Sequence, residues 1–89
     1  MNDRHYVYLA RCRDGSLYTG TCLDLAAREN AHNDGTGAKY TRSRRPVRFV
    51  YHETYATLSE ARKREAEIKR LTRERKILLL PKKMRRDLL

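Results

Sequence analysis

This 89-residue sequence has few cysteines and no long apolar run. Its two cysteines, Cys12 and Cys22, are too few for the disulfide framework of a small secreted domain. No apolar run approaches the length of about 18 residues that a membrane-spanning helix needs, and no basic-then-apolar leader opens the chain. We therefore expect a reduced, cytoplasmic protein with no membrane span.

Acidic residues are also scarce, with 11 Asp and Glu against 21 Lys and Arg, which leaves a formal net charge of +10. A cation excess of this size favours an anionic partner, and nucleic acid is the commonest one. A membrane surface is disfavoured because the basic residues are spread along the chain and form no single amphipathic face. The chain length predicts one small domain that buries roughly 60 to 65% of its unfolded surface in a modest core.

A β-hairpin is predicted near the start, where Tyr6-Val7-Tyr8 and Tyr18-Thr19-Gly20 flank an Asp14-Gly15 turn. A loop of two or four residues would place Tyr8 and Tyr18 on opposite faces of the ribbon. A three-residue loop with Gly15 in a left-handed bulge places Ala10 opposite Tyr18, so that both tyrosines share a face. We favour the three-residue loop, because it gathers the polar residues described below.

The remaining pattern predicts a small α+β fold: a three-stranded antiparallel sheet flanked by helices. Residues 1–80 are expected to form one domain, and residues 81–89 a basic C-terminal tail that can be disordered. The predicted elements are a helix opened by Thr21 and ending near Asn33, a basic loop or short helix over 35–46, a strand over 47–51, a helix over 58–71 opened by the capping box Thr57-Leu-Ser-Glu60, and a short helix from Thr72 to Leu80.

Charged residues occupy positions that should face the core. The inward stripe of the 58–71 helix is Leu58, Ala61, Glu65, Ile68 and Thr72. Glu65 in its middle needs a partner, because a buried carboxylate is unfavourable by several kcal/mol. In the first helix, Arg28 and His32 lie on one side. If both stripes meet the face that carries Tyr8 and Tyr18, the five side chains form one plausible catalytic pocket.

Together these residues resemble the GIY-YIG nuclease family, whose two name-giving motifs are answered by Tyr6-Val7-Tyr8 and Tyr18-Thr19-Gly20. The family's helical arginine matches Arg28, its next histidine or tyrosine matches His32, and its metal-binding glutamate matches Glu65. The likeness covers roughly residues 5 to 80. It is greatest to the small stand-alone bacterial members with a single domain.

The resemblance implies a metal-dependent endonuclease acting on DNA. Glu65 would hold one divalent ion, most simply Mg²⁺ with Mn²⁺ as the substitute, because Mg²⁺ keeps several waters beside one carboxylate. Arg28 would hold a phosphate oxygen. Tyr8 and Tyr18 would border the attacking water, one as general base and one as orienting group, and His32 would share the proton transfer. Four basic residues would contact phosphates outside the pocket: Lys39, Arg42, Arg44 and Arg45.

Structural roles remain open for the same residues. Tyr8 and Tyr18 can simply pack in the core. Arg28 and Glu65 can form an ion pair between two helices, and His32 can be a charge at a helix C-terminus. Thr21 stands where repair nucleases of the family carry a lysine, which favours the alternative of a weakly active or inactive nucleic-acid-binding module. A helix-turn-helix regulator is disfavoured by the initial hairpin.

Overall fold

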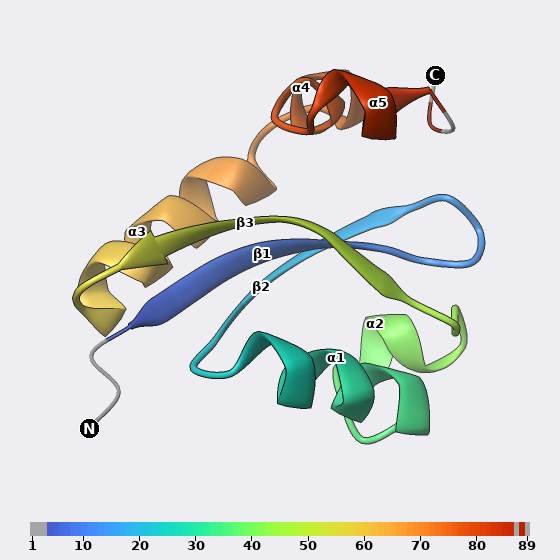
Figure 1. The fold of residues 1–89 in the computed structure, drawn as a ribbon, viewed down its shortest axis with the longest axis horizontal. Helices are drawn as coiled ribbons and strands as arrows, with labels where there is room; N and C mark the ends of the chain where they lie inside the picture. Colours follow the sequence, from blue (N-terminus) through green and yellow to red (C-terminus); the bar gives the residue numbers. More distant parts are fainter. Residues whose placement is uncertain (1–3, 87, 89) are drawn as a thin grey trace.

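The computed structural model describes residues 4–86 and 88, which form a small antiparallel sheet covered by helices on both faces (Figure 1). The elements in chain order are β1 (His5–Arg11), β2 (Leu17–Cys22), α1 (Leu25–Asp34), α2 (Lys39–Arg42), β3 (Arg48–Tyr55), α3 (Leu58–Lys69), α4 (Arg73–Leu78) and α5 (Lys82–Arg85). The strand order is β2-β1-β3, so that β1 is central. The predicted α+β class and three-stranded antiparallel sheet are confirmed.

The hairpin loop has the predicted three residues. The Cys12 N–H donates to the Ser16 carbonyl at 2.9 Å, which leaves residues 13–15 as the loop. Gly15 has a φ of 85°, in the left-handed region that glycine adopts without a steric penalty. Ala10 therefore faces Tyr18 across the ladder, and both motif tyrosines lie on the same face.

The two faces of the sheet carry different residues and are covered by different helices. On one face, Val7 and Leu9 of β1 pack with Ala61 and Ile68 of α3 in the hydrophobic core. The opposite face carries Tyr8 and is covered by α1 and α2 (Figure 1). The expectation that the inward stripes of both helices meet on one face is therefore wrong. Neighbouring residues of a strand point to opposite faces, so Tyr8 lies on the face opposite Val7 and Leu9.

The N-cap of helix α1 lies three residues after Thr21, the predicted cap. Thr21 pairs with Val7 in the β1–β2 ladder, so its backbone is occupied as strand. The cap is Asp24, whose carboxylate accepts from the Ala27 N–H at 3.0 Å. The helix ends at Gly35, with a φ of 89°. The Thr57 capping box of α3 forms as predicted, since Thr57 Oγ1 accepts from the Glu60 N–H at 3.2 Å.

Strand β3 continues to Tyr55, beyond the predicted end at residue 51, because it pairs with β1 as far as His5. Its polar part is anchored by Glu53. The Glu53 carboxylate accepts hydrogen bonds from the hydroxyls of Tyr51 and Tyr55 and a bidentate pair from Arg64, at 2.9 and 3.1 Å. The pair fixes α3 against β3.

The C-terminal segment packs on the domain as far as it is described. Thr72 caps α4 as predicted, and residues 82–85, within the predicted tail, form α5. Leu88 is 8% exposed and belongs to the core, so an apolar contact holds this end of the chain. Asp87 and Leu89 of the predicted tail lie outside the described residues. Within the described part of the chain, no helix is long and apolar enough to cross a membrane.

Candidate active site

Tyr8, Arg28 and His32 meet on the sheet face that α1 covers. The Tyr8 hydroxyl lies 2.7 Å from His32 Nε2 and 3.4 Å from Arg28 Nε. Tyr8 is 1% exposed and His32 is fully buried. The spacing of Arg28 and His32, one turn apart on α1, places both over the central strand. Four of the predicted site residues thus lie together once Tyr18 is added.

Tyr18 completes the cluster from the edge strand. Its ring lies 6.3 Å from that of Tyr8 and 5.5 Å from that of His32, and it stacks on Tyr40 at 5.8 Å. Tyr8 is covered on its other side by Phe49, with ring centroids 4.0 Å apart. Tyr18 remains partly exposed. It is therefore the motif tyrosine that solvent can reach.

Two glycines make room for the buried groups. A Cβ on Gly20 would lie 2.6 Å from Tyr8 Cζ, and a Cβ on Gly37 would lie 2.5 Å from His32 Nδ1. Any other residue at either position would displace the ring beside it. Gly20 of the second motif thus leaves the space that the Tyr8 ring of the first motif occupies.

The surroundings of Tyr8 and His32 shift the pKa of each side chain. Burial raises the pKa of Tyr8 to about 12, although the hydrogen bond from Arg28 opposes the rise. Burial, and then the positive charge of Arg28, lower the pKa of His32. Both changes favour a protonated phenol beside a neutral imidazole.

Glu65 lies on α3, the helix whose Ala61 and Ile68 pack on the other face of the sheet. Its carboxylate is 3.3 Å from Lys69 Nζ, one helical turn away, and its side chain is 21% exposed. Arg28 donates to Tyr8 instead of pairing with Glu65, so the alternative of an ion pair between these two is not formed. Helix α3 also contacts the edge strand β2, which carries Tyr18.

The donor set for a metal ion is therefore small. Among residues 4–86 and 88, no three His, Cys, Asp or Glu side chains lie close enough together to hold an ion. Glu65 alone offers one carboxylate, which suits Mg²⁺ because this ion keeps most of its water shell.

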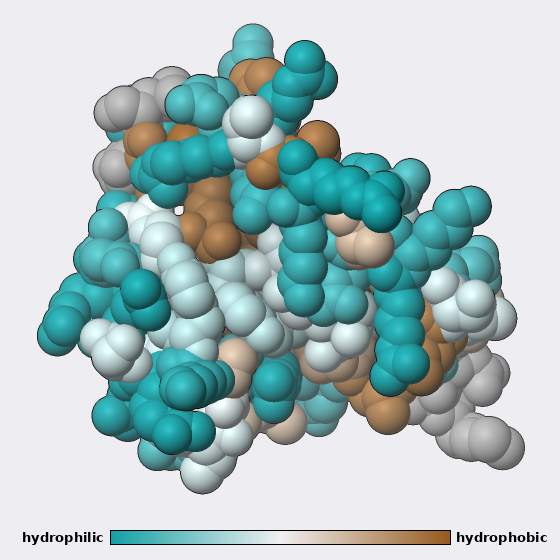
Figure 2. Space-filling view, turned by 180° about the vertical axis from the view of Figure 1, so that it is seen from behind, coloured by the Kyte–Doolittle hydropathy of each residue, from teal (hydrophilic) through white to brown (hydrophobic). Residues whose placement is uncertain are grey.

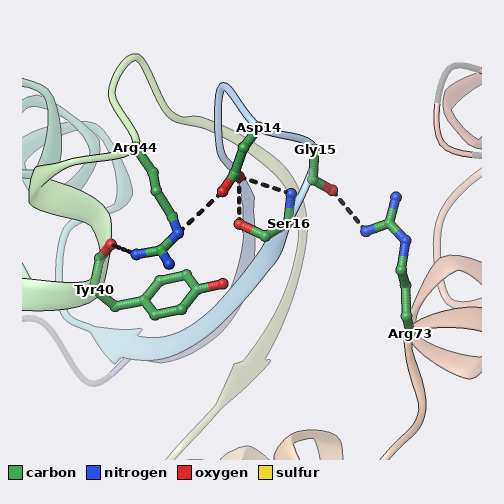
Figure 3. A network of polar contacts seen from close by, with 6 residues as sticks. All are labelled: Asp14, Gly15, Ser16, Tyr40, Arg44 and Arg73. Carbon is green, nitrogen blue, oxygen red and sulfur yellow. Dashed lines mark hydrogen bonds and ion pairs between the residues drawn. The ribbon is translucent and has the colours of Figure 1, made fainter.

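The predicted basic segment divides into two pairs. Arg44 forms an ion pair with Asp14 at 3.0 Å, and its guanidinium lies 3.9 Å from the centre of the Tyr40 ring. Arg73 donates to the Gly15 carbonyl at 2.6 Å, so the hairpin turn is held from two sides (Figure 3). Arg45 donates to the carbonyls of Arg42 and Asn33. Lys39 and Arg42 are exposed basic residues of α2.

The fold adds basic residues that the sequence pattern did not indicate. A hollow of about 490 Å³ is lined by Arg13, Arg42 and Arg45 among others, and a second of about 420 Å³ shares Arg13 and Pro46 with it. The further cations of the second hollow are Arg11, Arg48 and Lys83. They come from the hairpin, the start of β3 and α5, so no local sequence pattern joins them. The reverse view shows hydrophilic side chains over most of that face (Figure 2).

This chain is similar to known proteins over most of its length. The GIY-YIG catalytic domain model matches residues 4–77. A UPF0213 protein of Staphylococcus epidermidis is 58% identical over 78 residues, which cover 88% of this chain and 95% of that protein. The solution NMR structure of a UPF0213 protein of Bacillus halodurans is 45% identical, with a TM-score of 0.55 over 85% of this chain and 81% of that chain. A protein of E. faecalis, also solved by NMR, is 48% identical, with a TM-score of 0.57 over 85% and 83%.

Proposed function

Because this chain belongs to the GIY-YIG family, we propose that it is a divalent-metal-dependent endonuclease that hydrolyses phosphodiester bonds in DNA. The observation that carries the proposal is the joining of Tyr8, Arg28 and His32 by hydrogen bonds beside the partly exposed Tyr18. A purely structural cluster has no need of a solvent-facing phenol next to a guanidinium. The same arrangement suits an anionic substrate.

Tyr18 borders the attacking water in this mechanism, and Tyr8 is the orienting phenol. Their exposure separates the two roles, since Tyr8 is 1% exposed and Tyr18 is accessible. A neutral phenol is a weak base at neutral pH, so it needs a nearby cation. Among the protein's own side chains, Arg28 supplies this positive charge.

Arg28 holds the scissile phosphate. Its Nε is directed at Tyr8, and the two terminal nitrogens of the guanidinium remain for a pair of nonbridging oxygens. Guanidinium suits this task because it is always charged and binds in a planar, bidentate manner. It stabilises the charge that builds up on the phosphate during in-line attack.

Glu65 would hold the divalent ion through its carboxylate, most simply Mg²⁺ with Mn²⁺ as the substitute. When bound, such an ion neutralises the charge on the leaving oxygen. Glu65 first has to exchange its ion pair with Lys69 for the metal. A surface pair of this kind contributes about 0.3 to 0.5 kcal/mol, so the exchange is easy.

The two basic hollows give the substrate its second contact. Arg13, which lines both hollows, and Arg42, which lines the first, are exposed, and the hollows join the hairpin tip to the loop after α2. Cations at such positions hold the nucleic-acid backbone without reading its sequence.

A nucleic-acid-binding module of the same fold is the second candidate. Two observations favour it. Thr21, where related repair nucleases carry a lysine, is occupied in the β1–β2 ladder, and Glu65 pairs with Lys69 on the helix of the other face. The basic hollows would serve binding equally well.

One experiment separates the two candidates. Labelled duplex, flap, branched and single-stranded DNA are incubated with the protein in Mg²⁺, in Mn²⁺ and in chelator, beside a Tyr18→Phe variant. The variant keeps the ring stack on Tyr40 and loses only the hydroxyl. Cleavage by the parent in metal alone, and its loss in the variant, supports the enzyme. Tight binding with equal, background cleavage in every lane supports the binding module.

A further inference from the structure

Thr41, a fully buried residue of α2, begins a chain of hydrogen bonds whose direction can be assigned. Its Oγ1 lies 3.0 Å from the Ala38 carbonyl oxygen. A carbonyl has no proton to give, so Thr41 is the donor of this bond. A hydroxyl has only one proton, and that of Thr41 is now used. Toward any other partner Thr41 can only accept.

His32 is that other partner. Its Nδ1 lies 2.7 Å from Thr41 Oγ1; with the Thr41 proton on the Ala38 carbonyl, Nδ1 is the donor of this contact and carries a proton. A neutral imidazole has one N–H, which leaves Nε2 as an acceptor. The Tyr8 hydroxyl, 2.7 Å from Nε2, therefore donates to it.

The last link is Arg28. Its Nε can only donate, and it lies 3.4 Å from the Tyr8 oxygen, whose lone pairs are still available. Every donor in the chain thus meets an acceptor, from Arg28 through Tyr8, His32 and Thr41 to the Ala38 carbonyl. The chain has one consistent direction, and Thr41 sets it.

We propose that Thr41 is a positioning residue for Arg28, acting by fixing the His32 tautomer that lets Tyr8 turn its lone pairs toward the guanidinium. His32 and Tyr8 connect the buried Thr41 to Arg28 through their hydrogen bonds. The effect on turnover rests on the proposed nuclease function, whereas the tautomer does not.

The reverse tautomer shows why the direction matters. With the proton on Nε2, His32 would donate to Tyr8, and the Tyr8 proton would turn toward Arg28 Nε. Two donors would then face each other at 3.4 Å, and the guanidinium would move away. A group misplaced by up to about 1 Å loses up to roughly a hundredfold in rate.

The test compares Thr41→Val, which keeps the shape and removes the acceptor, with Thr41→Ser, which keeps the hydroxyl. The ¹⁵N NMR shifts of the imidazole at neutral pH report the His32 tautomer in the protein without substrate. The exchange of the Arg28 Nε–H with water reports the last link. Cleavage of the best substrate under metal is measured alongside.

We expect the Nδ1–H tautomer and a slowly exchanging Arg28 Nε–H in the parent and in Thr41→Ser. In Thr41→Val the tautomers mix, the Arg28 proton exchanges faster and turnover falls by about tenfold to a hundredfold. An Nε2–H tautomer in the parent overturns the proposal, even where Thr41→Val does not fold. So does a folded Thr41→Val with parental tautomer and exchange. Absence of cleavage in the parent would instead count against the nuclease function, while the NMR readouts still decide the role of Thr41.

Discussion

Gly20 of β2 faces Tyr8 of β1 so closely that a side chain on the glycine would collide with the phenol. The space left by the missing Cβ is where Tyr8 extends toward His32. The two name-giving motifs of the family therefore depend on each other for the position of one hydroxyl.

Replacing Gly20 with alanine should destabilise the fold by about 1 to 3 kcal/mol, since a methyl group would be forced into a filled space. Urea unfolding measures this. Thr21→Ala, on the same strand and partly exposed, is the control and should change stability less. Parental stability of Gly20→Ala would mean that Tyr8 moves aside without difficulty.

Arg28→Lys should not preserve activity. An ammonium group keeps the charge but cannot bind two phosphate oxygens while also donating to Tyr8. We expect a large fall in kcat in the presence of the divalent metal, and a free energy of unfolding close to that of the parent. Near-parental turnover would show that Arg28 supplies only its charge.

Glu65→Ala should abolish metal-dependent cleavage and leave the fold intact, because its ion pair with Lys69 is worth only about 0.3 to 0.5 kcal/mol. Glu67→Ala is the matched control on the same helix, since Glu67 is more exposed and forms a similar long pair with Arg64. Equal cleavage by the Glu65 variant and the parent would exclude the metal-ligand role. Unfolding of the variant would instead assign Glu65 to the structure.

Glu53→Gln should reduce stability at pH 7 by about 1.5 to 3 kcal/mol, the range for hydrogen bonds to a charged group. Burial raises the pKa of Glu53, but hydrogen bonds from Arg64, Tyr51 and Tyr55 outweigh it and hold the pKa below its usual range. A lowered folded pKa gives stability that is present above the unfolded pKa, near 4.3, and is lost as the pH falls through the folded value. The gap between parent and variant should therefore close between about pH 5 and pH 3. A constant gap in urea unfolding across that range would contradict the charge assignment.

Changing Arg13 and Arg42 to alanine should weaken DNA binding by similar factors on every sequence. The slope of log affinity against log salt should fall by roughly 0.7 to 0.9 for each phosphate that the variant no longer binds. Turnover at saturating substrate should stay close to parental, because both residues lie outside the Tyr8 cluster. The control changes Arg62 and Lys63, two exposed cations of α3 that line neither hollow. An unchanged slope in the Arg13 and Arg42 variant would make the hollows ordinary solvated surface.

Local signals in the sequence predicted most of the elements. The Asp14-Gly15 turn and the Thr57 capping box each act within a few residues, so their geometry follows from the residues themselves. The choice of the three-residue loop used the grouping of polar residues, and the register confirms it. The Thr21 cap failed because pairing with Val7, which is distant in sequence, competes for the same backbone.

The site was harder to predict, because periodicity shows that a residue faces the sheet but not which face. Glu65 lies on an inward stripe, yet α3 packs on the face opposite Tyr8. Burial also separates Tyr8 from Tyr18, which look equivalent in sequence. The basic hollows join residues as distant as Arg11 and Lys83, a proximity that only the fold creates.

The central position of β1 has a dynamic consequence. Its amides and carbonyls are paired on both sides, while β2 and β3, in the described part of the chain, each leave one edge without a neighbouring strand. Local opening begins at such edges, and doubly paired strands open only with the whole fold. Amide protons near Tyr8 should therefore exchange last, and those around Tyr18 much sooner. That order of exchange would place Tyr8 on a strand that opens only with the whole fold and Tyr18 on a strand that opens more easily.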